Sequence, residues 1–95
     1  MSAPRLEIDL AKVHHNAHTL VERLGRRGIA VTAVTKGTLG SAAIAHELVR
    51  AGVHGLGDSR IENVEALRRA GITAPITLIR SPMLSQIDRV VAHAD

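Results

Sequence analysis

The chain of 95 residues repeats one unit four times, a short apolar run followed by an amphipathic stretch. Alternating or continuous apolar runs predict β-strands, and apolar residues spaced three and four apart predict helices. The predicted strands are 6–10, 29–35, 53–57 and 76–79, and the predicted helical stretches are 11–24, 41–51, 59–70 and 82–91. Strands that alternate with helices predict an α/β fold with a parallel sheet and right-handed crossovers.

Local signals support these boundaries. Ser41 can cap the second helix, and Gly52 and Gly71 follow the ends of the second and third helices. The run from Ser59 to Glu62 matches a capping box, in which a hydroxyl and a carboxylate satisfy backbone donors. The run 29–35 is almost continuously apolar, which predicts a strand buried on both faces. The apolar helix faces predicted to pack are Val13, Ala17, Leu20, Val21 and Leu24, then Ile44, Ala45, Leu48 and Val49, then Ile61, Val64 and Leu67, and last Ile87, Val90 and Val91.

Such a parallel sheet can be an open doubly wound sheet or part of an eight-fold barrel. The dinucleotide fingerprint of the open sheet is incomplete, because Gly55-Leu-Gly57 lacks the third glycine. A phosphate-binding P-loop is also absent, since Lys36 precedes Gly37 and Gly40 instead of following them. The pattern therefore favours a (β/α)8 TIM-type barrel.

A complete barrel of this type takes about 250 residues. Four units in 95 residues correspond to half of it. We therefore expect residues 1–95 to be the N-terminal part of the barrel, with its remainder and any further domain absent from this sequence.

Composition excludes several functions. The net charge of +3 comes from ten arginines scattered along predicted helices and two lysines, and no aromatic residue is available to stack on bases. Nucleic-acid binding is therefore disfavoured. No apolar run approaches the roughly 20 residues that span a bilayer. The chain has no cysteine and no apolar N-terminal leader, which together favour a cytoplasmic protein.

Lys36 is the strongest candidate for chemistry. It ends the apolar run 29–35, and in barrels the functional residues gather at the C-terminal ends of strands. We expect the aliphatic part of its side chain to be buried and its amine to lie at the C-terminal end of the strand. Desolvation there favours the neutral, nucleophilic form of the amine. The aldehyde that enzymes most often offer such a lysine is pyridoxal 5'-phosphate. A surface lysine after an ordinary strand is the alternative.

The strand ends resemble a known family when they are taken together. The segments 6–10 (LEIDL), 13–16 (VHHN) and 33–37 (AVTKG) look like the opening of the alanine racemase family. The segments 57–63 (GDSRIEN) and 78–83 (LIRSPM) look closer to its branch of ornithine racemase and other amino-acid racemases. The resemblance covers nearly the whole chain, in order and with the spacing of the family.

This resemblance implies a pyridoxal phosphate-dependent racemase that interconverts L- and D-amino acids. Lys36 would hold the cofactor as a Schiff base and then act as one of two proton-transferring bases at the substrate α-carbon. In alanine racemases the second base is a tyrosine from the C-terminal β-domain of the partner subunit, so the resemblance implies a homodimer, and these 95 residues alone should be inactive. Alanine racemases also carry a tyrosine four residues after the lysine, where this chain has Gly40. That departure favours the ornithine racemase branch but does not identify the substrate, which we expect to be a small or basic amino acid.

Two further residues are candidate contacts of the cofactor. Arg80 would lie at the end of the fourth predicted strand, where a guanidinium can hold a carboxylate or a phenolate oxygen. Asp58 would lie where the third predicted strand ends and could reach the substrate amine or orient Arg60. A salt bridge for Arg80 and simple solvation for Asp58 are the alternatives. Ser59 is better explained by the capping box than by catalysis.

His14 and His18 have the i,i+4 spacing of a metal-binding pair. No accompanying carboxylate–histidine set completes a metalloprotease motif, so a solvated helix face is the preferred interpretation.

Two other functions remain open. A pyridoxal phosphate homeostasis protein shares the barrel and the lysine but has no β-domain. A non-enzymatic half-barrel could instead pair with a second copy through its unpaired edge strands.

Overall fold

The structure, a computed structural model, describes residues 3–95. Its helices are α1 (Leu10–Gly25), α2 (Ala42–Arg50), α3 (Ile61–Arg69) and α4 (Ile87–His93), with the 3-10 turns η1 (Lys36–Thr38) and η2 (Leu84–Gln86). Its strands are β1 (Thr32–Val34), β2 (Gly55–Asp58) and β3 (Ile76–Leu78). They form a parallel sheet in the order β1-β2-β3, so the predicted alternation of strand and helix is confirmed for three of the four units.

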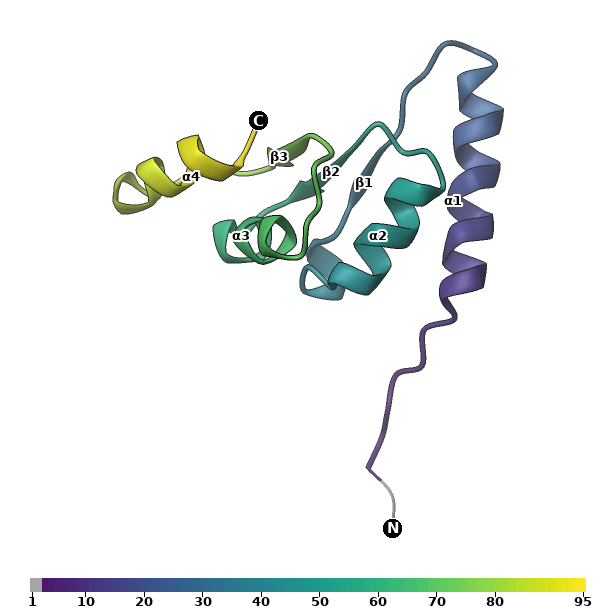
Figure 1. Cartoon of the computed structure of the whole chain (residues 1–95), viewed down its shortest axis with the longest axis horizontal. Helices are drawn as coiled ribbons and strands as arrows, with labels where there is room; N and C mark the ends of the chain where they lie inside the picture. Colours follow the sequence, from purple (N-terminus) through teal and green to yellow (C-terminus); the bar gives the residue numbers. More distant parts are fainter. Residues whose placement is uncertain (1–2) are drawn as a thin grey trace.

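The helices are laid out along the sheet in chain order. Figure 1 shows α2 and α3 side by side on one side of the sheet, α4 beside β3, and α1 beside α2 at the opposite end. The register pairs Val34 with Gly57 and Asp58 with Leu78. The three strands therefore end close to one another at a common edge.

The core lies between the sheet and α2 and α3. Leu56 of β2 and Ile76 of β3 are fully buried against three side chains of α3. Those three are Ile61, Val64 and Leu67, the face predicted from the helical spacing. Burial of one such aliphatic side chain stabilises the fold by about 1.5–3 kcal/mol. Because these contacts are concentrated on β2, β3 and α3, this part of the chain is the best-packed.

The opposite face of the sheet is open. Thr32 and Val34 of β1 are exposed, as are Thr77 of β3 and Ile79 just after it. These residues alternate with the buried ones, as successive side chains of a strand must. The prediction that strand 29–35 is buried on both faces is therefore wrong for this structure, because no element within residues 3–95 covers the second face.

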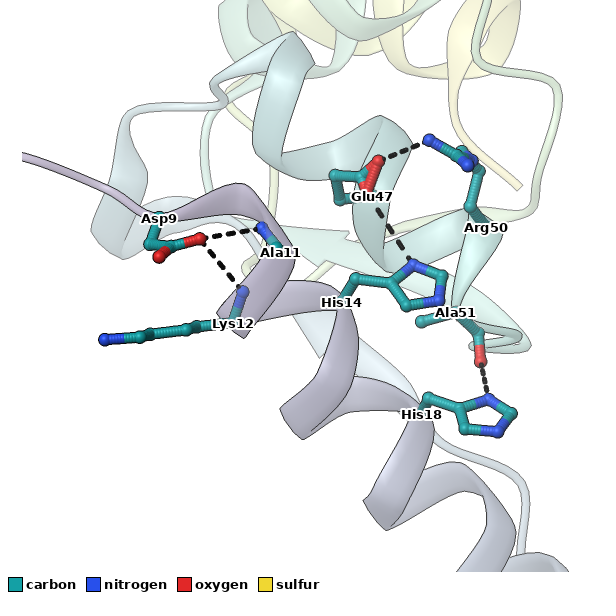
Figure 2. A network of polar contacts seen from close by, with 8 residues as sticks. All are labelled: Asp9, Ala11, Lys12, His14, His18, Glu47, Arg50 and Ala51. Atoms are coloured by element: carbon teal, nitrogen blue, oxygen red, sulfur yellow. Dashed lines mark hydrogen bonds and ion pairs between the residues drawn. The ribbon is translucent and has the colours of Figure 1, made fainter.

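The predicted strand 6–10 is not formed. Leu6 is 84% exposed and Ile8 is 43% exposed, and within residues 3–95 this segment pairs with no strand. Asp9 begins α1 instead, because one of its carboxylate oxygens accepts hydrogen bonds from the backbone N–H groups of Ala11 and Lys12, at 3.0 and 3.2 Å (Figure 2). An alternating pattern needs a neighbouring strand to become a β-strand, whereas an N-cap needs only its own helix.

The other helix signals give one confirmation and one correction. Ser41 caps α2 by accepting from the N–H of Ile44, and glycines with positive φ follow α2 and α3 as predicted. The capping box of Ser59 and Glu62 is wrong, because the N-cap of α3 is Arg60 and no side chain caps it. The backbone N–H of Arg60 donates instead to the buried carboxylate of Asp58, at 2.9 Å.

Helix α1 lies against α2 through polar contacts and half-buried apolar side chains. His14 Nδ1 lies 3.6 Å from Oε2 of Glu47, and the other carboxylate oxygen of Glu47 accepts from Arg50 at 2.6 Å (Figure 2). His18 Nδ1 lies 3.4 Å from the carbonyl oxygen of Ala51.

No group of three or more histidine or acidic side chains in the described part of the chain is arranged to hold a metal ion. None of the helices within residues 3–95 has both the length and the apolar character to span a membrane.

Candidate active site

The candidate site is the C-terminal end of the sheet, the edge at which all three parallel strands end. Lys36 follows β1, Asp58 ends β2, and Arg80 comes two residues after β3. Because Val34 pairs with Gly57 and Asp58 pairs with Leu78, these three connections leave the sheet at the same edge. The register therefore brings the three connections to the same end of the sheet, and the role of each residue stays a prediction.

Lys36 is the first residue of η1, and its side chain is exposed. The expectation that the aliphatic part of this side chain is buried is wrong for this structure. The reason is the position of β1, which forms the outer strand of the sheet and has one uncovered face. The amine is consequently open to a carbonyl compound at the sheet edge.

Asp58 is the last residue of β2, but its side chain is buried and does not reach the surface. Its side chain is 0% exposed, and both carboxylate oxygens accept hydrogen bonds from protein groups. One oxygen accepts from the hydroxyl of Thr35 at 2.7 Å, and the other accepts from the backbone of Arg60 and the amide of Asn63. A contact between Asp58 and a cofactor stays a prediction that this burial does not favour.

Arg80 and Arg60 line a cavity of about 150 Å³ between the start of α3 and the segment after β3. Both side chains are exposed, and the nearest carboxylate to the guanidinium of Arg60 is that of Glu62, 3.9 Å from Nε. Among residues 3–95 no carboxylate forms a salt bridge with Arg80. The alternative of a salt bridge for Arg80 therefore has no support here, and its guanidinium can hold an anionic group.

Two residues of this region were not predicted, Thr35 and Asn63. Thr35 is fully buried and donates to Asp58, and Asn63 donates to the same carboxylate at 3.0 Å. A hydroxyl at the end of an apolar run was a signal for Thr35. Asn63 lies inside a helix, where its role depends on a tertiary contact that spacing does not show.

The residues at this edge fit the chemistry of pyridoxal phosphate. An exposed primary amine on Lys36 can combine with its aldehyde, and the guanidinium of Arg80, which pairs with no carboxylate within residues 3–95, can hold one of its oxygen anions. Both groups come from the same end of a parallel sheet, the end at which barrel enzymes carry their sites.

Comparison with known proteins identifies the class. The alanine racemase N-terminal domain family matches residues 8–95, so the chain belongs to this family. In fold, the chain is similar to the alanine racemase of Bacillus anthracis solved with bound L-Ala-P, with a TM-score of 0.71 and 26% identity. That likeness covers 92% of this chain and 25% of the other, and it confirms the N-terminal part of a TIM-type barrel as the fold.

Curated relatives are amino-acid racemases of different specificity. The lysine racemase of Thermotoga maritima is 45% identical over 95 residues, which are 100% of this chain and 27% of the relative. The ornithine racemase of Acetoanaerobium sticklandii is 34% identical over 97% of this chain and 26% of its own length. The broad specificity amino-acid racemase of Aeromonas hydrophila is 26% identical over 93% of this chain and 22% of its own length. The chain thus spans about a quarter of the length of these relatives.

Proposed function

We propose that this chain is the lysine-bearing part of a pyridoxal phosphate-dependent amino-acid racemase. The observation that carries the proposal is the exposed amine of Lys36 at the C-terminal end of the sheet. The segment that carries Arg80 leaves β3 at the same end. Membership of the alanine racemase N-terminal domain family supports it. We further propose a basic amino acid as the substrate, because two of the relatives are a lysine racemase and an ornithine racemase.

Lys36 and Arg80 would have different roles in the reaction at the substrate α-carbon. Pyridoxal phosphate, when bound, supplies a conjugated ring that takes up the electron pair left by removal of the α-proton. The amine of Lys36 would take or return that proton on one face of the substrate. Arg80 would hold an oxygen anion of the cofactor or the substrate carboxylate. The opposite face needs a second base, and this chain contains no tyrosine to provide one. Because alanine racemases, which the chain resembles, take that base from the partner subunit, we propose a homodimer as the active form and expect no racemisation by these 95 residues alone.

The test is selective labelling of the purified chain. Only Lys12, Lys36 and the terminal amine can combine with pyridoxal phosphate, and borohydride fixes the product for peptide mapping by mass spectrometry. Both lysine side chains are exposed, so accessibility alone predicts equal labelling. Preferential labelling of Lys36 would show that its surroundings activate the amine.

Matched variants complete the experiment. Lys36→Arg should remove most of the label, while Lys12→Arg should leave it nearly unchanged. Labelling that is equal at the two lysines, or greater at Lys12, would contradict the assignment of Lys36 as the cofactor lysine.

One structural observation favours a second function, a half-barrel that associates with itself. The outer edge of β1 is unpaired within residues 3–95, and Val34 and Ile79 are 52% and 41% exposed on the open face. Exposed edges and apolar faces favour association. Concentration-dependent association without selective labelling of Lys36 would support this function and not the racemase.

A further inference from the structure

Asp58 is a buried carboxylate that joins three separate elements. It is 0% exposed and lies at the end of β2. It accepts from Thr35, the residue after β1, at 2.7 Å, and from Asn63 of α3 at 3.0 Å. A buried charge is costly unless hydrogen bonds satisfy it, so these partners fix its position and it fixes theirs.

The loop of residues 35–40, which carries Lys36, begins at Thr35 and ends in contact with Asn63. The carbonyl oxygen of Thr35 accepts from the backbone N–H groups of Thr38 and Gly40, both at 3.1 Å. Gly40 has φ +68 and packs so closely on Asn63 that an added Cβ would lie 2.7 Å from the Asn63 Cβ. The loop is therefore held at its start by Asp58 and at its end by Asn63.

We propose that Asp58 and Asn63 are positioning residues that hold the loop 35–40 and thereby orient the amine of Lys36. This proposal rests on the proposed function of Lys36. The side chain of Lys36 is exposed, so its backbone is what determines where the amine can reach. Proton transfer at a substrate carbon requires a base held close to the productive geometry. Asp58 acts through Thr35 and touches no reacting atom in this arrangement.

Substitutions at Asp58 and Thr35 separate geometry from charge. Asp58→Ala and Thr35→Val remove the hydrogen bond, whereas Thr35→Ser keeps the hydroxyl. Asp58→Asn keeps an oxygen for Arg60 and Asn63 and can donate to the hydroxyl of Thr35. We expect Asp58→Ala and Thr35→Val to lower the ratio of Lys36 to Lys12 labelling by about tenfold. Thr35→Ser and Asp58→Asn should stay near the wild-type ratio.

Amide hydrogen exchange of residues 35–41 tests the loop without any cofactor. Asp58→Ala and Asn63→Ala should each speed exchange of the Gly40 amide by about tenfold. Ile72→Val, buried in the same core but outside the loop contacts, is the control for a general loss of stability. It should change neither the labelling ratio nor the exchange of Gly40 relative to the core amides.

The outcomes distinguish the two proposals. Equal labelling of the lysines in the wild-type chain would overturn the function of Lys36, and exchange of the loop would still decide whether Asp58 holds it. Selective wild-type labelling that persists in Asp58→Ala would overturn the positioning role alone. Loss of selectivity in Asp58→Asn with an unchanged loop would also overturn it, because the carboxylate would then act by its charge.

Discussion

Helices α3 and α1 are both amphipathic, yet they are buried to different depths. α3 has nine residues and buries three of them against β2 and β3, whereas α1 has 16 residues and buries none. An apolar groove of about 400 Å³ lies between α1, α2 and β1 and includes Leu20 and Val31 in its lining. The difference teaches that an amphipathic pattern identifies the face that packs, while the surface available to that face determines how deeply it is buried.

The largest expected effect tests this difference directly. Leu67 of α3 is 0% exposed, and Leu20 of α1 is 50% exposed. Leu67→Ala should lower the free energy of unfolding by about 2–5 kcal/mol, because it removes apolar contacts and leaves a cavity. Leu20→Ala should lower it by less than about 1 kcal/mol. Urea unfolding followed by circular dichroism measures both values.

Equal effects of the two leucine substitutions would contradict the comparison. They would mean that α1 contributes to the core as much as α3 does. A change in the urea dependence itself, and not in the midpoint, would indicate that α1 separates from the rest before the core unfolds.

Much of α3 and its surroundings could be predicted from the sequence. The buried face of Ile61, Val64 and Leu67 follows from helical spacing, and the helix end at Gly71 follows from the need for positive φ. Such features depend on residues close together in the chain. They need no information about which elements meet in space.

What could not be predicted depends on distant contacts. Ser59 offered a local cap for α3, but the helix takes Arg60 as its N-cap, and the adjacent Asp58 is held by Thr35, 23 residues away in the chain. Leu6 and Ile8 alternate as a strand does, but a strand forms only beside another. The exposure of Lys36 likewise follows from the outer position of β1, which no local pattern reveals.

An intermediate effect is expected at the contact between α3 and α4. Arg89 donates to both carboxylate oxygens of Glu65 and lowers the pKa of that carboxyl. The backbone N–H of Ile76 donates to Asp95, and this bond, with Arg68, lowers the pKa of Asp95. A carboxyl with a lowered pKa in the folded state stabilises it above its ordinary pKa, and this contribution is lost as pH falls through the lowered value.

Acid should therefore release α4 from α3 while the α3 core remains folded. Hydrogen exchange of the α4 amides across an acid titration measures this release. Glu65→Gln should give faster exchange in α4 at neutral pH and a weaker dependence on acid. Exchange in α4 that is insensitive to both acid and this substitution would show that apolar contacts alone hold the helix.

The smallest effect is expected at the polar contact of α1 with α2. His14 lies 3.6 Å from Glu47, and Glu47 keeps Arg50 as a partner when the imidazole is removed. His14→Gln should change the free energy of unfolding by only about 0.2–0.5 kcal/mol, because a 3.6 Å contact is too long for a good hydrogen bond. Val21→Ala, a half-buried side chain of α1 packed on the core, should cost more in the same urea experiment. If His14→Gln cost more than Val21→Ala, polar contacts would hold α1 in place, and the shallow burial of this helix would no longer imply weak attachment.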